Sequence, residues 1–312
     1  MVSVPHERTF APRTFRPLRL LNTYTGHRSA VYALAPAAEP GTFFSAGSDG
    51  TVVRWNCGTP NDGTGIAQLP RPVFSVCHMN YHILAGLDDG AIHVLDLITQ
   101  REVRNLRLHA KGAFALLPLN ANTLLASAGG EGSIGLWHWP AMELARQIPL
   151  GSAKVRGLAL SNDGQWLAAS CNDGFVRILD TIDFNELITL NAHVDGAYGL
   201  AFHPTKQVLI TGGRDGHMRA WRMHGQWEQV LDVPAHQGSI YSIAFSPDGR
   251  YLATASRDKT AKVWDAQSLE PLARLDRAAG GHTHSVNALL WLPDGSLVTA
   301  GDDKRIVQWQ VP

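Results

Sequence analysis

Histidine, a hydroxyl residue and aspartate recur along the chain in an arrangement that could form a catalytic triad. In such a triad an imidazole activates a hydroxyl nucleophile, and a carboxylate orients the imidazole. Here the three types recur with closely similar offsets, each time followed by a tryptophan, in four places: His27, Ser45, Asp49, Trp55; His193, Thr211, Asp215, Trp221; His236, Thr254, Asp258, Trp264; and His282, Thr299, Asp303, Trp309. A hydrolytic site needs one triad, so four copies favour a repeated structural role.

Two further motifs could bind a cofactor or a metal. Residues 130–135 satisfy the GxGxxG pattern of dinucleotide sites, but that pattern must open a helix, and here an apolar strand-like segment follows it. His282 and His284 are close in sequence, but no further candidate metal ligands lie near them in the sequence. The cysteines Cys57, Cys77 and Cys171 form no CxxC pair that could bind zinc. We therefore predict no catalytic residue, no cofactor and no metal.

The elements that carry these residues repeat at a fixed interval. Seven related sequence segments, such as LATASRDKTAKVW, end 40 to 45 residues apart. Their last residues are Trp55, Leu95, Trp137, Leu179, Trp221, Trp264 and Trp309. A period of this length is typical of a β-propeller with four strands in each blade. Short apolar segments broken by Asp-Gly turns predict strands, and no segment has a sustained helical period. We expect one all-β domain.

The chain resembles the WD40 repeat family over nearly its whole length. The clearest copy runs from Ala235-His236 to Trp264-Asp265, and the Gly-His dipeptides at Gly26-His27 and Gly281-His282 also match the family pattern. The resemblance implies a seven-bladed propeller of four-stranded antiparallel blades. It also implies that the histidine, hydroxyl, aspartate and tryptophan of each set form a buried hydrogen-bonded chain.

Three repeats depart from this pattern. In the third, Glu131 stands where the aspartate is expected, beside His109, Ser127 and Trp137. The second and fourth repeats have Leu95 and Leu179 in place of tryptophan and lack the histidine. We expect apolar packing alone in those two blades.

The ends of the chain predict how the ring closes. The last repeat stops after its third strand, and by the resemblance residues 15–24 supply the missing outer strand. Pairing both termini in one blade removes an open edge. We therefore assign residues 1–14 to a flexible tail and 15–312 to the propeller.

Positions that differ between repeats are the candidates for function. The resemblance implies a ring at the mouth of the central channel, formed by the residue five after the repeat histidine. In the second and fourth repeats, which lack that histidine, the alignment uses the preceding apolar residue, Val73 or Val155. We call these residues the mouth ring: Tyr32, Phe74, Phe114, Arg156, Tyr198, Tyr241 and Asn287. The turn position before the aspartate adds two adjacent cations, Arg214 and Arg257. Aromatic residues and arginine are the types that dominate binding hot spots. The alternative is that the aromatic rings only plug a narrow channel.

These observations predict a non-enzymatic scaffold that docks a peptide or protein segment at the channel mouth. A propeller hydrolase that holds calcium would need several oxygen ligands, and the mouth ring offers only Asn287. A nucleic-acid platform is disfavoured because Lys+Arg and Asp+Glu both number 27, which gives no net positive charge. No apolar run is long enough for a membrane span or a signal peptide. We expect a cytoplasmic, monomeric propeller within a larger complex.

Overall fold

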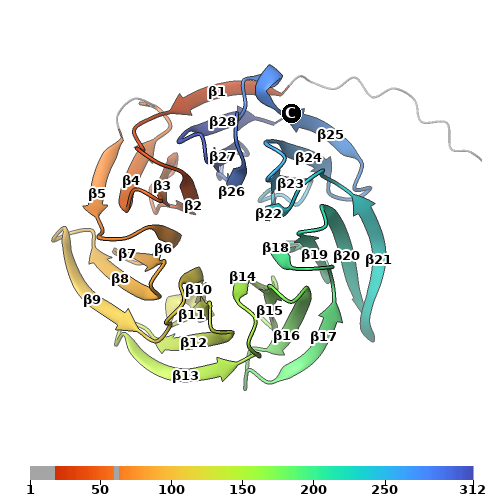
Figure 1. The fold of residues 1–312 in the computed structure, drawn as a ribbon, viewed down its shortest axis with the longest axis horizontal. Helices are drawn as coiled ribbons and strands as arrows, with labels where there is room; N and C mark the ends of the chain where they lie inside the picture. Colours follow the sequence, from red (N-terminus) through yellow and green to blue (C-terminus); the bar gives the residue numbers. More distant parts are fainter. Residues whose placement is uncertain (1–17, 60–62, 312) are drawn as a thin grey trace, which may run out of the picture.

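The computed structural model describes residues 18–59 and 63–311. It consists of seven four-stranded antiparallel sheets arranged as blades around a central axis (Figure 1), so the predicted all-β, seven-bladed propeller is confirmed. The predicted tail, 1–14, and the first residues of the predicted closing strand lie outside the described residues.

The first six blades run in chain order from the innermost strand to the outermost. Blades 1 to 3 comprise β2 (Val31–Pro36), β3 (Thr42–Gly47), β4 (Thr51–Asn56), β5 (Thr64–Gln68); β6 (Val73–Met79), β7 (His82–Leu87), β8 (Ala91–Asp96), β9 (Arg101–Arg107); and β10 (Ala113–Leu119), β11 (Leu124–Gly129), β12 (Ser133–His138), β13 (Glu143–Pro149). Blades 4 to 6 comprise β14 (Val155–Leu160), β15 (Trp166–Cys171), β16 (Phe175–Asp180), β17 (Glu186–Asn191); β18 (Ala197–Phe202), β19 (Val208–Gly213), β20 (His217–His224), β21 (Gln226–Pro234); and β22 (Ile240–Phe245), β23 (Tyr251–Ser256), β24 (Ala261–Asp265), β25 (Pro271–Leu275).

Blade 7 joins the two ends of the chain. Its strands are β26 (Val286–Trp291), β27 (Leu297–Gly301), β28 (Ile306–Gln310) and the N-terminal strand β1 (Arg19–Tyr24), which pairs with β28. The predicted closure by the N-terminal segment is confirmed. Tyr24 at the end of β1 is fully buried, and its hydroxyl donates a hydrogen bond to Gln308 Oε1 at 2.7 Å.

Tight turns between the second and third strands bring neighbouring blades into contact. Gly90 follows β7 with φ +93°, and Gly174 follows β15 with φ +91°, a backbone region that favours glycine. A side chain on Gly90 would place its Cβ 2.1 Å from the carbonyl oxygen of His109, on the loop that enters the next blade. The Asp-Gly turns therefore both reverse the chain and allow close packing between blades.

The apolar core lies between the blades. Phe44 and Val52 of blade 1, for example, pack in one cluster with Ile83 and Leu87 of blade 2. Helical structure in the described ranges consists of two short 3-10 segments, η1 (Asn120–Asn122) and η2 (Arg277–Ala279). Within those ranges no helix has the length and apolar character needed to cross a membrane.

Candidate functional site: the channel mouth and the framework beneath it

The mouth ring lies at one place on every blade. Each member is the second residue of an innermost strand, so the repeated register brings all of them to the same end of the channel. They surround one cavity of about 390 Å³, whose lining residues are Tyr32, Phe74, Phe114, Arg156, Tyr198, Tyr241, Asn287 and Asp302. The structure thus brings together all seven residues predicted for the ring.

The aromatic members form two groups in contact around the cavity. Phe74 stacks on Phe114 with ring centroids 5.2 Å apart and planes 9° from parallel, and Tyr32 lies 5.8 Å from Phe74. On the other side, the rings of Tyr198 and Tyr241 are 6.0 Å apart. Offset and tilted contacts of this kind stabilise aromatic pairs. The cavity is therefore bounded by two aromatic walls.

Arg156 separates the two aromatic groups. Its guanidinium carbon lies 4.5 Å from the centroid of the Phe114 ring and 5.4 Å from that of Tyr198. Burial lowers the pKa of this guanidinium, while the neighbouring tyrosines act in the opposite direction. An arginine nevertheless stays charged in proteins. Within residues 18–59 and 63–311 no ion pair joins it to a carboxylate, and the faces of the two rings lie beside its charge.

One carboxylate from outside the mouth ring also lines the cavity. Asp302 lines the cavity from the turn between β27 and β28. Asn287 fixes it there: its Nδ2 donates to Asp302 Oδ1 at 2.7 Å and to the carbonyl oxygen of Val31 at 3.0 Å. The cavity therefore has a cation on blade 4 and an anion on blade 7.

The two turn arginines lie outside this cavity. Arg214 and Arg257 are exposed, and neither is among the lining residues. Burial raises the pKa of the Tyr241 hydroxyl, and the charge of Arg257 acts against that shift, so this arginine lies near the ring. The sequence identified the cations of the turns but not the central position of Arg156 between two rings.

The predicted polar sets form continuous chains that join the second and third strands of a blade to the loop before its first strand. In blade 6, His236 Nε2 lies 2.8 Å from Thr254 Oγ1 and its Nδ1 lies 2.9 Å from Asp258 Oδ2, while Trp264 Nε1 donates to Thr254 Oγ1 at 2.9 Å. The same contacts join His27, Ser45, Asp49, Trp55; His193, Thr211, Asp215, Trp221; and His282, Thr299, Asp303, Trp309. The four hydroxyl residues are 0% exposed, so a substrate cannot reach them.

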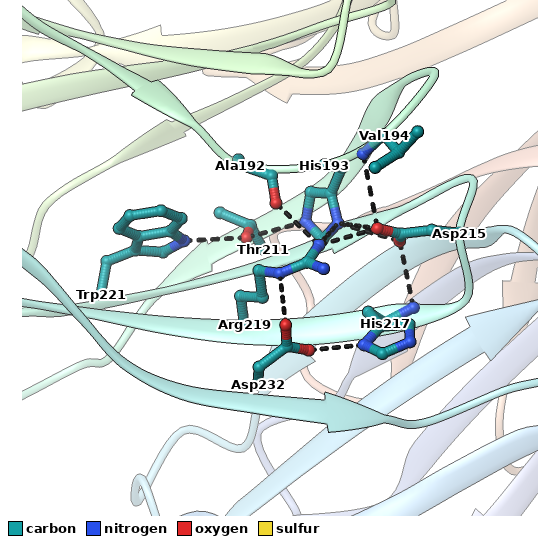
Figure 2. A network of polar contacts seen from close by, with 9 residues as sticks. All are labelled: Ala192, His193, Val194, Thr211, Asp215, His217, Arg219, Trp221 and Asp232. Carbon is teal, nitrogen blue, oxygen red and sulfur yellow. Dashed lines mark hydrogen bonds and ion pairs between the residues drawn. The ribbon is translucent and has the colours of Figure 1, made fainter.

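Blade 5 carries an extension of this chain that the repeat pattern did not reveal (Figure 2). Arg219 Nη1 donates to Asp215 Oδ2 at 2.8 Å, and its Nε donates to Asp232 Oδ2 at 2.9 Å. Asp232 also contacts His217 Nδ1. Charge-assisted bonds of this geometry link β20 to the outermost strand β21. The alternation of His217 and Arg219 on one face of β20 is the sequence signal for it.

The atypical blades use other contacts at the same positions. In blade 3, Glu131 accepts hydrogen bonds from His109 and from Ser133, so the longer carboxylate replaces the aspartate. In blades 2 and 4, the tryptophan positions are occupied by Leu95 and Leu179, and both are buried in apolar clusters. Apolar packing takes the place of the histidine, hydroxyl and tryptophan there. The aspartates of these blades still form ion pairs, Asp89 with Arg107 at 3.4 Å and Asp173 with Arg177 at 2.9 Å, so the expectation of apolar packing alone is wrong.

The aspartates of the polar chains make the fold less stable at acid pH. Burial raises the pKa of the Asp258 carboxyl, but hydrogen bonds from His236, Thr260 and a backbone N–H outweigh it, so the pKa lies below its ordinary value. A carboxylate whose pKa is lower in the folded state than in the unfolded state stabilises the fold. This contribution is fully present above the pKa of the unfolded state, about 4, and it is lost as the pH falls through the pKa of the folded state.

We expect Asp258→Asn to reduce the free energy of unfolding by about 1–3 kcal/mol at pH 7, because it removes a charged acceptor from buried donors. Asparagine does not titrate, so the difference in the free energy of unfolding between the variant and wild type should shrink as the pH falls below about 4. Urea titrations of both proteins between pH 7 and 2.5 measure it. A difference that stays constant over that range would contradict the assignment.

Comparison with known proteins agrees with this architecture. The sequence pattern of the family "WD domain, G-beta repeat" matches residues 18–56, 146–180, 184–222, 227–265 and 271–310, which together exceed half of the chain. The stretch without a match contains the second repeat, which lacks the histidine and tryptophan, and the third, which has Glu131.

Curated relatives are similar at low identity. WD repeat-containing protein 91 homolog of Dictyostelium discoideum is 22% identical over 67% of this chain and 28% of its own length. WD repeat-containing protein 81 of Homo sapiens is 26% identical over 67% of this chain and 11% of its own length. Periodic tryptophan protein 2 homolog of Mus musculus is 23% identical over 63% of this chain and 24% of its own length. The chain therefore spans less than a third of the length of each of these proteins. On the repeat matches and the propeller, this chain belongs to the WD40 repeat family.

Proposed function

We propose that this protein is a non-enzymatic interaction scaffold that docks a peptide or protein segment at the mouth of its channel. The observation that carries the proposal is the cavity of about 390 Å³ with two aromatic walls and the desolvated Arg156 between them. Family membership supports it at a coarser level, since WD40 propellers are typically non-enzymatic scaffolds. The buried hydroxyls of the polar chains also offer no accessible nucleophile.

Docking would proceed by insertion of one partner side chain between the aromatic walls. An acidic group on the same segment would pair with Arg156, whose charge lacks a carboxylate partner in the described part of the chain. Arg214 and Arg257, exposed on neighbouring turns, would attract that segment from solution without lining the cavity. Burial of aromatic and arginine side chains provides the binding free energy.

The plug alternative rests on the contacts between the rings. Those contacts stabilise the inner strands, but they leave the central cavity unfilled. A calcium-dependent hydrolase finds less support, because the residues that the structure describes contain no group of three or more His, Cys, Asp or Glu side chains that could hold a metal ion. Three free cysteines are consistent with the reducing compartment that a cytoplasmic scaffold would occupy. We propose that the propeller acts there as a monomer within a larger complex.

Replacing Tyr241 with alanine should remove the bound partner. Truncating a hot-spot aromatic typically costs at least about 2 kcal/mol, or roughly thirtyfold in affinity. The measurement is affinity purification on wild-type protein and on Tyr241→Ala, with mass spectrometry of what is lost. Tyr81→Ala is the matched control, because Tyr81 is 67% exposed in the turn after β6, at the other end of that strand from Phe74. Partners retained equally by all three proteins would contradict the proposal.

A further inference from the structure

A second and larger cavity lies between blades 5 and 6, away from the channel mouth. Its volume is about 630 Å³, and none of its lining residues belongs to the mouth ring. Residues that follow or end the inner strands contribute to it, among them His203 after β18 and Phe245 at the end of β22. Since the mouth ring lies at the start of these strands, the cavity opens toward the opposite end of the blades. We call it the side pocket.

One wall of the side pocket is apolar and exposed. Val230 and Leu231 on β21 line it and are 40% and 36% exposed. Neighbouring strand residues normally point to opposite faces, but β21 shifts register here: Ala220 pairs with Leu231 and Trp221 with Gln229. Val230 is the extra residue of this β-bulge, which explains how two consecutive side chains line one cavity. These two side chains place apolar surface beside the cavity, against which aliphatic groups of a ligand can pack.

The charged residues of the side pocket all carry one sign. Lys206 and Arg222 line it and are exposed, and its lining includes no aspartate or glutamate. In the described part of the chain neither cation has an ion pair, whereas Arg219 on blade 5 and Arg250 on blade 6 do. The pocket therefore presents uncompensated positive charge beside an apolar wall.

A buried donor without an acceptor lies in the same pocket. His203 is 4% exposed, and its Nδ1 accepts a hydrogen bond from the backbone N–H of Thr205 at 3.1 Å. Burial and the charge of Lys206 lower the pKa of this imidazole, so at neutral pH its single proton is on Nε2. That atom has no hydrogen-bond partner in the structure. A buried polar group without a partner is costly, and an acceptor brought by a ligand would satisfy it.

The backbone beside the pocket suits an extended ligand. β21 is the outermost strand of its sheet and pairs only with β20 among the strands described. With nine residues it is also the longest of these strands. Because it is the outermost strand, the backbone groups along one of its edges pair with no other strand that the structure describes. Exposed edges of this kind accept an additional strand from a partner.

We propose that the side pocket is a second docking site, which binds an extended acidic peptide segment of a protein partner through aliphatic side chains and a neighbouring carboxylate. The aliphatic side chains pack on Val230 and Leu231, and the carboxylate pairs with Lys206 and Arg222. The proposal is independent of the channel mouth, because the two cavities share no residue.

The test selects a phage-displayed library of random dodecapeptides on the full chain and then measures binding of the enriched synthetic peptides by fluorescence anisotropy. We expect peptides that combine aspartate or glutamate with leucine, isoleucine or valine. Their affinity should fall at least about tenfold for the double variant Lys206→Glu and Arg222→Glu, because like charges then face each other. Arg104→Glu is the matched control, since Arg104 is exposed on the outer strand of blade 2.

The outcomes separate the two sites. Acidic peptides that bind wild type, Arg104→Glu and Tyr241→Ala equally, and the double variant weakly, support the side pocket whatever happens at the mouth. Enriched peptides that bind the double variant as well as wild type would overturn the proposal, and so would a selection that enriches no acidic peptide. Decanoate supplies the same chemistry in a free amphiphile; if its binding alone depends on Lys206 and Arg222, the peptide assignment is wrong.

Discussion

Removal of residues 1–24 should lower the melting temperature by roughly 10 °C or more and make the protein prone to aggregation. The deletion removes β1, which pairs with β28 from Arg19 to Tyr24. It also removes the fully buried Tyr24 ring, which lies 5.3 Å from Phe43 and 5.5 Å from Trp55. Loss of one large buried aromatic costs about 3–5 kcal/mol, and in a protein of this size each kcal/mol is worth a few degrees.

The unpaired edge of β28 adds a second effect. Without β1, its backbone donors and acceptors face solvent and can pair with another copy of the chain. Differential scanning calorimetry and light scattering measure both consequences. The control deletion, residues 1–12, removes only residues outside the described part of the chain and should melt close to wild type. If the longer deletion melts like the shorter one, β1 does not close the ring.

Trp264→Ala should reduce the free energy of unfolding by about 3–5 kcal/mol. The Trp264 side chain is 2% exposed and packs with Ile210, Met218 and Leu252 in the core between blades 5 and 6. Its truncation leaves a cavity there and removes the indole donor from Thr254. Chemical denaturation followed at equilibrium gives the value.

Trp264→Phe separates the two parts of this loss. Phenylalanine retains most of the apolar contact but has no N–H, so it should cost about 1–2 kcal/mol. Both variants, once folded at low temperature, should bind a mouth partner with unchanged affinity. A folded Trp264→Ala protein that unfolds with wild-type free energy would show that the polar chain does not anchor the blade.

The fold was predictable because each blade has the same packing requirement. Repeated Asp-Gly turns such as Asp49-Gly50 require a backbone that glycine adopts readily, and repeated tryptophans such as Trp309 fill the same space in successive blades. The sequence therefore repeats where the structure repeats. The register of the innermost strands follows from the repeat, which is why the spacing, together with the resemblance to the WD40 family, could identify the mouth ring.

The side-chain environment within the mouth was not predictable in the same way. The repeat places the backbone of Arg156 at the channel mouth. The position of its guanidinium group between Phe114 and Tyr198, however, depends on residues that differ from blade to blade. The contribution of Asp302 depends on its hydrogen bond from Asn287, a pair that occurs in blade 7. The side pocket likewise arises where residues unique to blades 5 and 6 meet, and no repeated motif marks it.

We expect the channel mouth to dock a partner, and not only to be packed by its aromatic rings. The direct test measures melting temperature and partner affinity on the same preparations of wild type, Tyr241→Ala and the control Tyr81→Ala, using the partner recovered by affinity purification. We expect Tyr241→Ala to weaken binding by roughly thirtyfold or more while its melting temperature stays within a few degrees of wild type. A Tyr241→Ala protein that is clearly destabilised but binds the partner with wild-type affinity would contradict the claim.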